Sequence, residues 1–333
     1  IYDKMKVFLN SHYSNNQKVK ISKYLKESKP DIVHVHNFFP LITPSVFDAC
    51  IENNIPVIHT LHNFRLICPS GLLMHKNKIY NKSIKKGAYS TIIDKVYKKS
   101  YLGTYAVARM IEYHKKNNTW NTKVDQFIAL TNFAKSKFLA SGFLDEKISI
   151  KPNFCSYNSY ENKNTKREGA LFVGRLSEEK GIKVLLKAWE NLSIKLKIIG
   201  DGPLSSLVMN NNNPNIEYLG FMNQKQIFNE MQKASFLVFP SIWGETFGMV
   251  IIESFANGLP VIASNIGSPS EIIKNDFNGL HFKTGDSNDL IKKINLLNSD
   301  KHKYKQMSLN AISEFQSYYK EEKNYELLIK IYK

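Results

Sequence analysis

Residues 241–264, SIWGETFGMVIIESFANGLPVIAS, restrict the possible folds more than any other segment. Short apolar runs lie before it at 236–239 and at its end at 261–263. Between them a glycine-containing turn leads into an apolar run that predicts a buried helix at 246–256. Such a turn directs unpaired N–H groups and the positive end of the helix dipole outward, so the segment predicts an anion-binding site.

Two carboxylates stand eight residues apart in this segment. Glu245 lies at the turn, and Glu253 lies within the first two helical turns. A carboxylate repels a phosphate, but it accepts hydrogen bonds from sugar hydroxyls beside one. The pair therefore favours a ligand that carries both a phosphate and hydroxyl groups.

The rest of the chain alternates between short apolar runs and longer amphipathic ones, which is typical of an α/β fold with parallel sheets. In the first half the predicted strands are 31–36, 56–60 and 126–130, and the predicted helices are 18–27, 45–53, 133–141 and a long basic, aromatic helix within 89–116. In the second half the predicted strands are 170–173, 195–199, 216–218, 236–239 and 261–263, and the predicted helices are 182–191, 224–233, 246–256 and 289–297.

Two such series predict two doubly wound, Rossmann-like domains that face a cleft. The polar stretch 157–167, YNSYENKNTKR, separates the series and is interpreted as a linker. The domains are then 1–156 and 168–315. Residues 316–333 form a final helix, which is a candidate to cross back to the first domain.

The formal net charge of +17 is concentrated in the first half of the chain. Residues 1–160 hold 24 Lys and Arg against 10 Asp and Glu, whereas the remainder holds 22 against 19. The excess suggests a negatively charged partner, such as nucleic acid, anionic lipid headgroups or a phosphorylated acceptor. A Lys- and Asn-rich composition without functional meaning is an equal alternative. The sequence has no zinc finger or RNP element, so a nucleic-acid partner is disfavoured.

Cysteine usage and hydropathy bear on the compartment. The three cysteines, Cys50, Cys68 and Cys155, are few and widely spaced, which fits a reducing cytoplasm better than a disulfide framework. No apolar run approaches the roughly 20 residues that span a bilayer. We expect a cytoplasmic protein, with peripheral attachment to the inner face of the cytoplasmic membrane as a further expectation.

A second glycine turn, GRLSEEKG at 174–181, follows a predicted strand and precedes a predicted helix. Gly174 allows a sharp turn at the end of the strand. Arg175 and Lys180 place two cations beside a helix start, where a diphosphate is bound well. An ordinary surface loop is the alternative, and GDGP at 200–203 is by itself a plain turn.

Together these segments resemble the family-four glycosyltransferases, retaining enzymes of the GT-B fold that use a nucleotide-diphosphate sugar. The resemblance runs from about residue 30 to 282 and keeps the family's order of motifs. The motifs are PDIVHVHN (30–37), TLHNFRLICP (60–69), GRLSEEKG, GDGP, the two glutamates with seven residues between them, GSPSEII (267–273) and NGLHF (278–282).

The resemblance implies how the donor is held in the second domain. Arg175 and Lys180, with Gly174 at the turn, bind the diphosphate and stabilise the charge on the leaving nucleotide. Three backbone N–H groups complete the cradle: those of Phe247, Gly248 and Met249. Glu253 accepts hydrogen bonds from the ribose and Glu245 from the donor sugar.

The resemblance further implies a mechanism. His62 lies near the donor sugar, and the acceptor attacks the sugar on the same face from which the leaving group departs. Glu245 and Glu253 are then not the acid and base of a glycosidase, which flank the scissile bond. No cofactor and no metal are expected, since the two cations and the helix terminus do the work of an ion.

Other side chains of the first domain are weaker candidates. His36 and Asn37, at the end of a predicted strand, are placed to line the cleft on the acceptor side. Arg65 either meets a charged acceptor or forms a structural salt bridge. A zinc site among His34, His36, His59, His62 and Cys68 is disfavoured because no CxxC or HxxxH spacing is present. We expect only one of His34 and His36 to face a given side.

The expected activity is sugar transfer to a glycan or a lipid-linked glycan of bacterial surface-polysaccharide synthesis, such as lipopolysaccharide or capsule. The alternatives are another GT-B enzyme, either a sugar-nucleotide epimerase or a glycogen-synthase-like transferase, and an inactive carbohydrate- or nucleotide-binding fragment. The last alternative arises because nothing before residue 30 matches the strand and glycine-rich loop with which the family begins. A truncated sequence is the preferred explanation.

Overall fold

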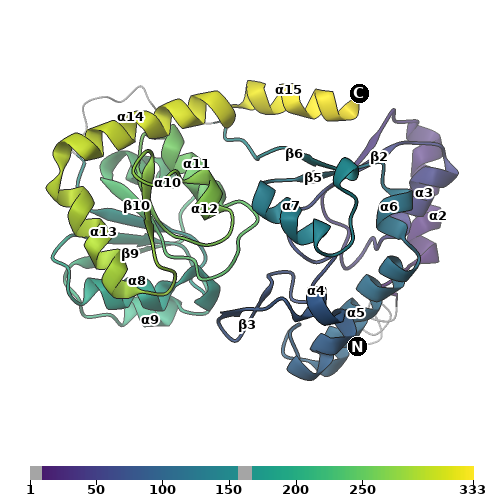
Figure 1. The fold of residues 1–333 in the computed structure, drawn as a ribbon, viewed down its shortest axis with the longest axis horizontal. Helices are drawn as coiled ribbons and strands as arrows, with labels where there is room; N and C mark the ends of the chain where they lie inside the picture. Colours follow the sequence, from purple (N-terminus) through teal and green to yellow (C-terminus); the bar gives the residue numbers. More distant parts are fainter. Residues whose placement is uncertain (1–9, 157–166) are drawn as a thin grey trace. The chain divides into compact units, whose positions relative to one another are not determined.

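The computed structural model describes residues 10–156 and 167–333, which form two compact units (Figure 1). The first unit comprises Ile1–Lys151 and Leu328–Lys333, and the second comprises Pro152–Leu327. Apart from Arg167, the predicted linker lies outside the described residues. The expected lack of the family's first strand concerns the start of the chain, where residues 1–9 also lie outside them.

The first unit is built on a parallel sheet with the strand order β1-β2-β5-β6. Its strands are β1 (Val33–Val35), β2 (Val57–Thr60), β5 (Gln126–Ala129) and β6 (Ile148–Ile150). The first three were predicted, with longer bounds for β1. The strand β6 was not predicted, because lysines flank its three residues and only Ile148 is buried.

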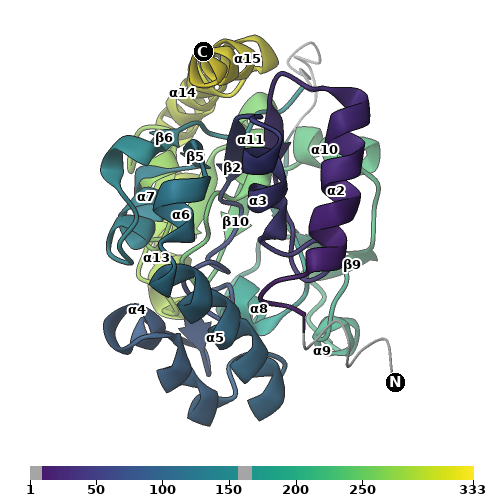
Figure 2. The same cartoon turned by 90° about the vertical axis from the view of Figure 1, so that its right-hand side faces the viewer.

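Helices cover this sheet, and Figure 2 shows two of them, α2 and α3, side by side. The helices of the first unit are α2 (Asn15–Ser28), α3 (Ser45–Glu52), α4 (Lys82–Lys86), α5 (Tyr101–Lys116), α6 (Thr119–Lys123) and α7 (Asn132–Leu139), with 3₁₀ turns η1 (Ala88–Asp94) and η2 (Asp145–Lys147). A short hairpin, β3 (Met74–His75) and β4 (Lys78–Ile79), lies between β2 and α4.

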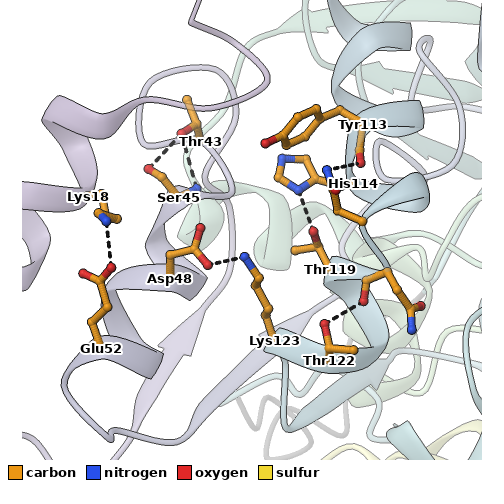
Figure 3. Close-up of polar contacts among 12 residues, drawn as sticks. Lys18, Thr43, Ser45, Asp48, Glu52, Tyr113, His114, Thr119, Thr122 and Lys123 are labelled. Carbon is orange, nitrogen blue, oxygen red and sulfur yellow. Dashed lines mark hydrogen bonds and ion pairs between the residues drawn. The ribbon is translucent and has the colours of Figure 1, made fainter.

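Polar contacts join these helices in pairs (Figure 3). Lys18 of α2 lies 2.7 Å from Glu52 of α3, and Lys123 of α6 pairs with Asp48 of α3. Inside the unit, buried His114 of α5 hydrogen-bonds through Nδ1 to the hydroxyl of Thr119, at 2.9 Å. Ion pairs and a hydrogen bond thus connect the helices that pack on the sheet of the first unit.

The prediction of one long helix within 89–116 was wrong. The segment forms η1, a turn and then α5. Lys95, Lys98 and Lys99 in the turn all have left-handed backbone, with φ of 51°, 51° and 54°, which no helix tolerates. Ser100 then caps α5 by accepting a hydrogen bond from the N–H of Gly103, so the helix begins at residue 101.

The second unit holds a six-stranded parallel sheet in the order β12-β11-β10-β7-β8-β9. Its strands are β7 (Ala170–Val173), β8 (Leu196–Ile199), β9 (Ile216–Gly220), β10 (Phe236–Phe239), β11 (Val261–Ser264) and β12 (Gly279–Phe282). Its helices are α8 (Ile182–Trp189), α9 (Ser205–Met209), α10 (Gln224–Lys233), α11 (Met249–Ala256), α12 (Pro269–Ile272), α13 (Ser287–Ser299) and α14 (Lys301–Tyr318), with a 3₁₀ turn η3 (Glu178–Lys180). The last helix, α15 (Glu321–Tyr332), begins in this unit.

The order of this sheet reverses between β7 and β10. From β7 the chain adds β8 and β9 on one side, whereas β10 pairs with the other edge of β7 and is followed outward by β11 and β12. In open α/β sheets ligands bind at the carboxyl ends of the two strands where the order reverses. The loops after β7 and β10 are the two glycine turns singled out in the sequence.

The C-terminal region differs in detail from the single helix predicted at 316–333. Two helices, α14 and α15, meet near Tyr319, and the last residues, Leu328–Lys333, group with the first unit. There the hydroxyl of Tyr332 lies 2.6 Å from Nδ1 of His34. The end of the chain therefore contacts His34 of β1.

Candidate active site

The loops after β7 and β10 touch through their backbones. A Cβ on Gly181, whose φ is +74°, would lie 1.9 Å from the carbonyl oxygen of Pro240. The carbonyl of Glu179 accepts hydrogen bonds from the N–H of Ile242 at 2.9 Å and from the hydroxyl of Ser241 at 3.1 Å. The two glycine turns, at the point where the strand order reverses, are therefore held in direct contact.

Lys180 and Glu245 form an ion pair across these loops, which the sequence did not predict. Glu245 is buried, and its Oε1 accepts hydrogen bonds from Lys180 Nζ at 2.5 Å, Ser241 Oγ at 2.8 Å and Trp243 Nε1 at 3.2 Å. No donor reaches its Oε2 within the described parts of the chain. One carboxylate oxygen therefore positions Lys180, and the other remains to accept from a ligand.

The GSPSEII motif holds Glu245 in place, a function that the sequence alone did not reveal. Both the N–H and the hydroxyl of buried Ser268 donate to the carbonyl of Glu245, at 3.1 and 2.7 Å. The neighbouring Gly267 has a φ of +68°, and a Cβ there would lie 2.7 Å from the nitrogen of Glu245. Glycine is needed at 267 for this close approach, because even the Cβ of alanine would clash with backbone atoms.

The start of α11 presents a row of unpaired donors. Gly248, with a φ of 96°, is the N-cap, so the helix begins at Met249 rather than at residue 246 as predicted. Among the residues that the structure describes, the backbone N–H groups of 247–250 donate to no acceptor. The side chain of Phe247 is buried against Tyr319, so residue 247 offers a ligand its backbone alone.

Arg175 and the GDGP turn lie at the carboxyl ends of β7 and β8 in the same sheet. Arg175 is exposed directly after β7, and no carboxylate pairs with it in the described ranges. Gly174, just before it, lies against Gly200 of the GDGP turn, where a Cβ would meet the Gly174 carbonyl oxygen at 1.9 Å. Gly200 is therefore required by this backbone contact, whereas a Cβ on Gly174 would meet only the ring of Phe172, at 3.4 Å.

Glu253 lies one helical turn further along α11. Burial raises the pKa of its carboxyl, and a hydrogen bond with Gln224 at the start of α10 opposes that shift. Phe221, directly after β9, is 82% exposed. No sequence pattern singles out Phe221, because only the strand order places it at the carboxyl edge of the same sheet.

The first unit gathers histidines at the ends of β1 and β2. Nδ1 of His36 lies 2.8 Å from Nε2 of His62, and the ring of His34 stacks on that of His36 at 4.3 Å. The expectation that His34 and His36 face different sides was wrong, because residues two apart on a strand share a face. Burial is the main cause that lowers the pKa of all three imidazoles, that of His34 to about 4.

A pocket opens beside this cluster and brings together the weaker candidates of the first unit. Its lining comprises His36, Asn37, Phe38, Phe39, His59, Thr60, His62, Asn63, Arg65 and Leu66. Lys151, at the end of β6, is 8% exposed, and its charge contributes to the lowered pKa of His34, His36 and His62. Sequence reasoning missed Lys151 because it missed β6. Among the described residues, no three His, Cys, Asp or Glu side chains converge as a metal site.

Comparison with known proteins identifies the family. The family model for Glycosyltransferase Family 4 matches residues 7–156, and that for Glycosyl transferases group 1 matches residues 157–314. An uncharacterized glycosyltransferase of Methanocaldococcus jannaschii is 31% identical over 258 residues, which is 75% of this chain and 67% of that protein. The chain belongs to the glycosyltransferase family.

Two further similarities place this glycosyltransferase chain among its relatives. An uncharacterized protein in the cps region of Klebsiella pneumoniae is 29% identical over 74% of this chain and 61% of its own length. The crystal structure of HepE from Anabaena in complex with UDP superimposes with a TM-score of 0.69, at 18% identity, over 94% of this chain and 80% of that one. The likeness shows the GT-B fold, two domains with parallel sheets.

Proposed function

We propose that this chain is a retaining glycosyltransferase that moves a sugar from a nucleotide-diphosphate sugar to a glycan or lipid-linked glycan. The observation that carries the proposal is the row of unpaired N–H groups at 247–250, on a loop in contact with the loop that carries Arg175 and Lys180, where the sheet order reverses. Backbone donors, a helix N-terminus and two cations match a diphosphate. The UDP bound to the structurally similar HepE supports this class of donor.

The same groups account for catalysis without a metal ion. In the proposed reaction the bond from the sugar C1 to the diphosphate oxygen breaks, and a bond from C1 to the acceptor oxygen forms on the same face. The acceptor proton passes to the departing phosphate oxygen. Arg175, Lys180 and the N–H groups stabilise the negative charge that develops on that diphosphate.

The carboxylates and His62 orient the donor in this proposal. Glu253 accepts from the ribose hydroxyls, and Oε2 of Glu245 accepts from the donor sugar while its Oε1 holds Lys180. His62 lies near the donor sugar. These assignments rest on the matching motif positions and on the hydrogen bonds that hold each side chain in place.

A panel of nucleotide sugars tests the donor class. We expect one UDP-, GDP- or ADP-sugar, at a concentration of 100 times its dissociation constant, to stabilise the second unit by about 2.7 kcal/mol. This corresponds to a rise of about 5 °C or more in its thermal unfolding temperature. The matching nucleoside monophosphate is the control, because it lacks the second phosphate. A chain that no nucleotide sugar stabilises would refute the proposal.

We further propose that the acceptor is lipid-linked and that the first unit docks on the inner face of the cytoplasmic membrane. Around η1 and α5, Ile93 and Leu102 are 72% and 71% exposed, and Lys95, Lys98 and Lys99 lie in the turn between them. Apolar tips with adjacent lysines suit an anionic bilayer surface. No helix in the described part of the chain is long and apolar enough to cross a membrane. The cps-region relative supports an acceptor of surface-polysaccharide synthesis.

Vesicle co-sedimentation checks the docking surface. The double variant Lys98→Gln/Lys99→Gln is expected to bind vesicles of anionic lipid at least about tenfold more weakly, since each lysine near the surface contributes about 1 kcal/mol. Lys301→Gln/Lys305→Gln removes the same charge from exposed positions of α14 and is expected to bind like the unmodified chain. Equal losses in the two double variants, or no binding of the unmodified chain at low salt, would contradict the proposal.

A further inference from the structure

Arg65 carries a positive charge that its surroundings do not compensate. The guanidinium lies against two aromatic rings, with Cζ 5.3 Å from the centroid of Phe39 and 5.0 Å from that of Tyr97. Its side chain donates one hydrogen bond, from NH1 to the carbonyl of Pro69. No carboxylate pairs with it in residues 10–156 or 167–333, so the salt bridge considered from the sequence is not found there.

This charge is also partly removed from water. Burial lowers the pKa of the Arg65 guanidinium. A desolvated cation without an anion is costly to the fold, and such a group commonly serves a ligand. The guanidinium has five N–H groups and NH1 donates to Pro69, so other N–H groups stay available for a bidentate contact.

Among the residues that the structure describes, no acid lines the pocket that contains Arg65. Its polar lining consists of histidines, Asn37, Asn63 and Thr60 beside that arginine. His36 and His62 share one hydrogen bond of 2.8 Å, and buried Lys151 lies close enough to disfavour a positive charge on both. An anion in the pocket would relieve that repulsion, because it attracts every one of these groups.

A buried nitrogen points to a ligand independently of these charges. His59 also lines the pocket and is 5% exposed, and its Nδ1 has no hydrogen-bond partner among the described residues. Buried polar atoms in native proteins nearly always have a partner. A hydroxyl of a bound molecule would supply one.

We propose that this pocket binds a phosphate group of the sugar acceptor, with Arg65 as its main anchor and one imidazole of the His36–His62 pair as a further donor. The inference rests on the proposed function, which supplies the acceptor, and it narrows the acceptor to phosphorylated glycans. Arg65 and the nearby Lys151 bring two positive charges, which is more than a carboxylate needs and matches a phosphate that carries up to two negative charges. The phosphate belongs either to a soluble sugar phosphate or to the diphosphate of a lipid-linked sugar.

The test follows phosphate binding through the imidazole NMR signals of His36 and His62 in the full chain. Inorganic phosphate and glucose 1-phosphate are expected to shift both signals in a saturable way, whereas methyl glucoside, which lacks the phosphate, leaves them unchanged. Arg65→Gln is expected to weaken the fitted affinity at least tenfold. Arg109→Gln removes an arginine of the same unit outside the pocket and is expected to bind like the unmodified chain.

Further arms identify the source of the phosphate and separate this inference from the donor proposal. Tighter binding of a short-chain prenyl diphosphate sugar than of glucose 1-phosphate supports a lipid-linked acceptor, and the reverse supports a soluble one. Donor binding by Arg65→Gln, measured in parallel, reports on the second unit and on folding. Unchanged phosphate affinity in a folded Arg65→Gln variant, or no shift of either histidine in the unmodified chain, would overturn the inference while leaving the donor proposal intact.

Discussion

Replacing Lys180 with Gln is expected to weaken binding of the nucleotide-diphosphate sugar at least about a hundredfold, or about 2.7 kcal/mol. Lys180 sits at the junction of the two glycine turns, with its side chain 23% exposed, so its charge acts on a diphosphate with little screening by water. Isothermal titration of the unmodified chain and the variant with the stabilising donor measures the difference. The rate of transfer is expected to fall further, since the charge on the diphosphate grows in the transition state.

The control variants separate a loss of binding from a loss of fold. Lys180→Gln leaves the buried Glu245 without its cation, which destabilises the unit. The double variant Lys180→Met/Glu245→Met removes both charges and is expected to recover stability without recovering donor binding. Lys183→Gln is the matched control, because Lys183 is 61% exposed and pairs with Glu178 in the same turn. Donor affinity that is unchanged in Lys180→Gln would disprove the assignment of this site.

Replacing Gly181 with Ala is expected to lower the free energy of unfolding of the second unit by more than about 3 kcal/mol. Two effects combine at this position: the left-handed backbone, with φ of +74°, and a Cβ placed 1.9 Å from the Pro240 carbonyl oxygen. The Pro240 carbonyl belongs to the backbone, so it cannot rotate away as a side chain would. Urea unfolding followed by the fluorescence of Trp189 and Trp243 measures the loss.

Gly220→Ala isolates the backbone effect from the clash. Gly220, in the same unit, has a φ of +69°, and nothing lies within 4 Å of a Cβ built there. Its loss is expected to be about 1 kcal/mol, from the left-handed conformation alone. Equal destabilisation by the two alanines would show that the loops after β7 and β10 are not in the close contact described.

Most of the second sheet was predictable because its strands are short apolar runs set between clear turns. The strand β12 was missed since Gly279–Phe282 contains a histidine among its four residues and had been noted only as a motif. In the first unit, β6 was hidden between lysines, and the break before α5 depends on three lysines in left-handed backbone. Left-handed backbone at a lysine does not change the pattern of apolar residues, so that pattern cannot predict it.

The residues of the donor site could be recognised from the sequence, whereas the contacts between them could not. The glycine turns and the two glutamates can be recognised by their residue types and spacing. The pairing of Lys180 with Glu245 joins positions 65 residues apart, and the support from Ser268 comes from a third loop. The histidine pocket likewise depends on the order β1-β2-β5-β6, which brings Lys151 near His36 and His62. Contacts of this kind arise from the strand order, which local patterns do not contain.

The most direct test of the central claim is the reaction itself, followed with the donor that stabilises the chain. Purified protein, donor and a glycan acceptor are incubated, and released nucleoside diphosphate and product are measured together, with the anomeric configuration of the new linkage read by NMR. We predict that nucleoside diphosphate is released in step with glycosylated acceptor, and that an α-linked donor gives an α-linked product. Conversion of the donor without any acceptor would instead indicate an epimerase or hydrolase, and an inverted linkage would contradict the retaining mechanism.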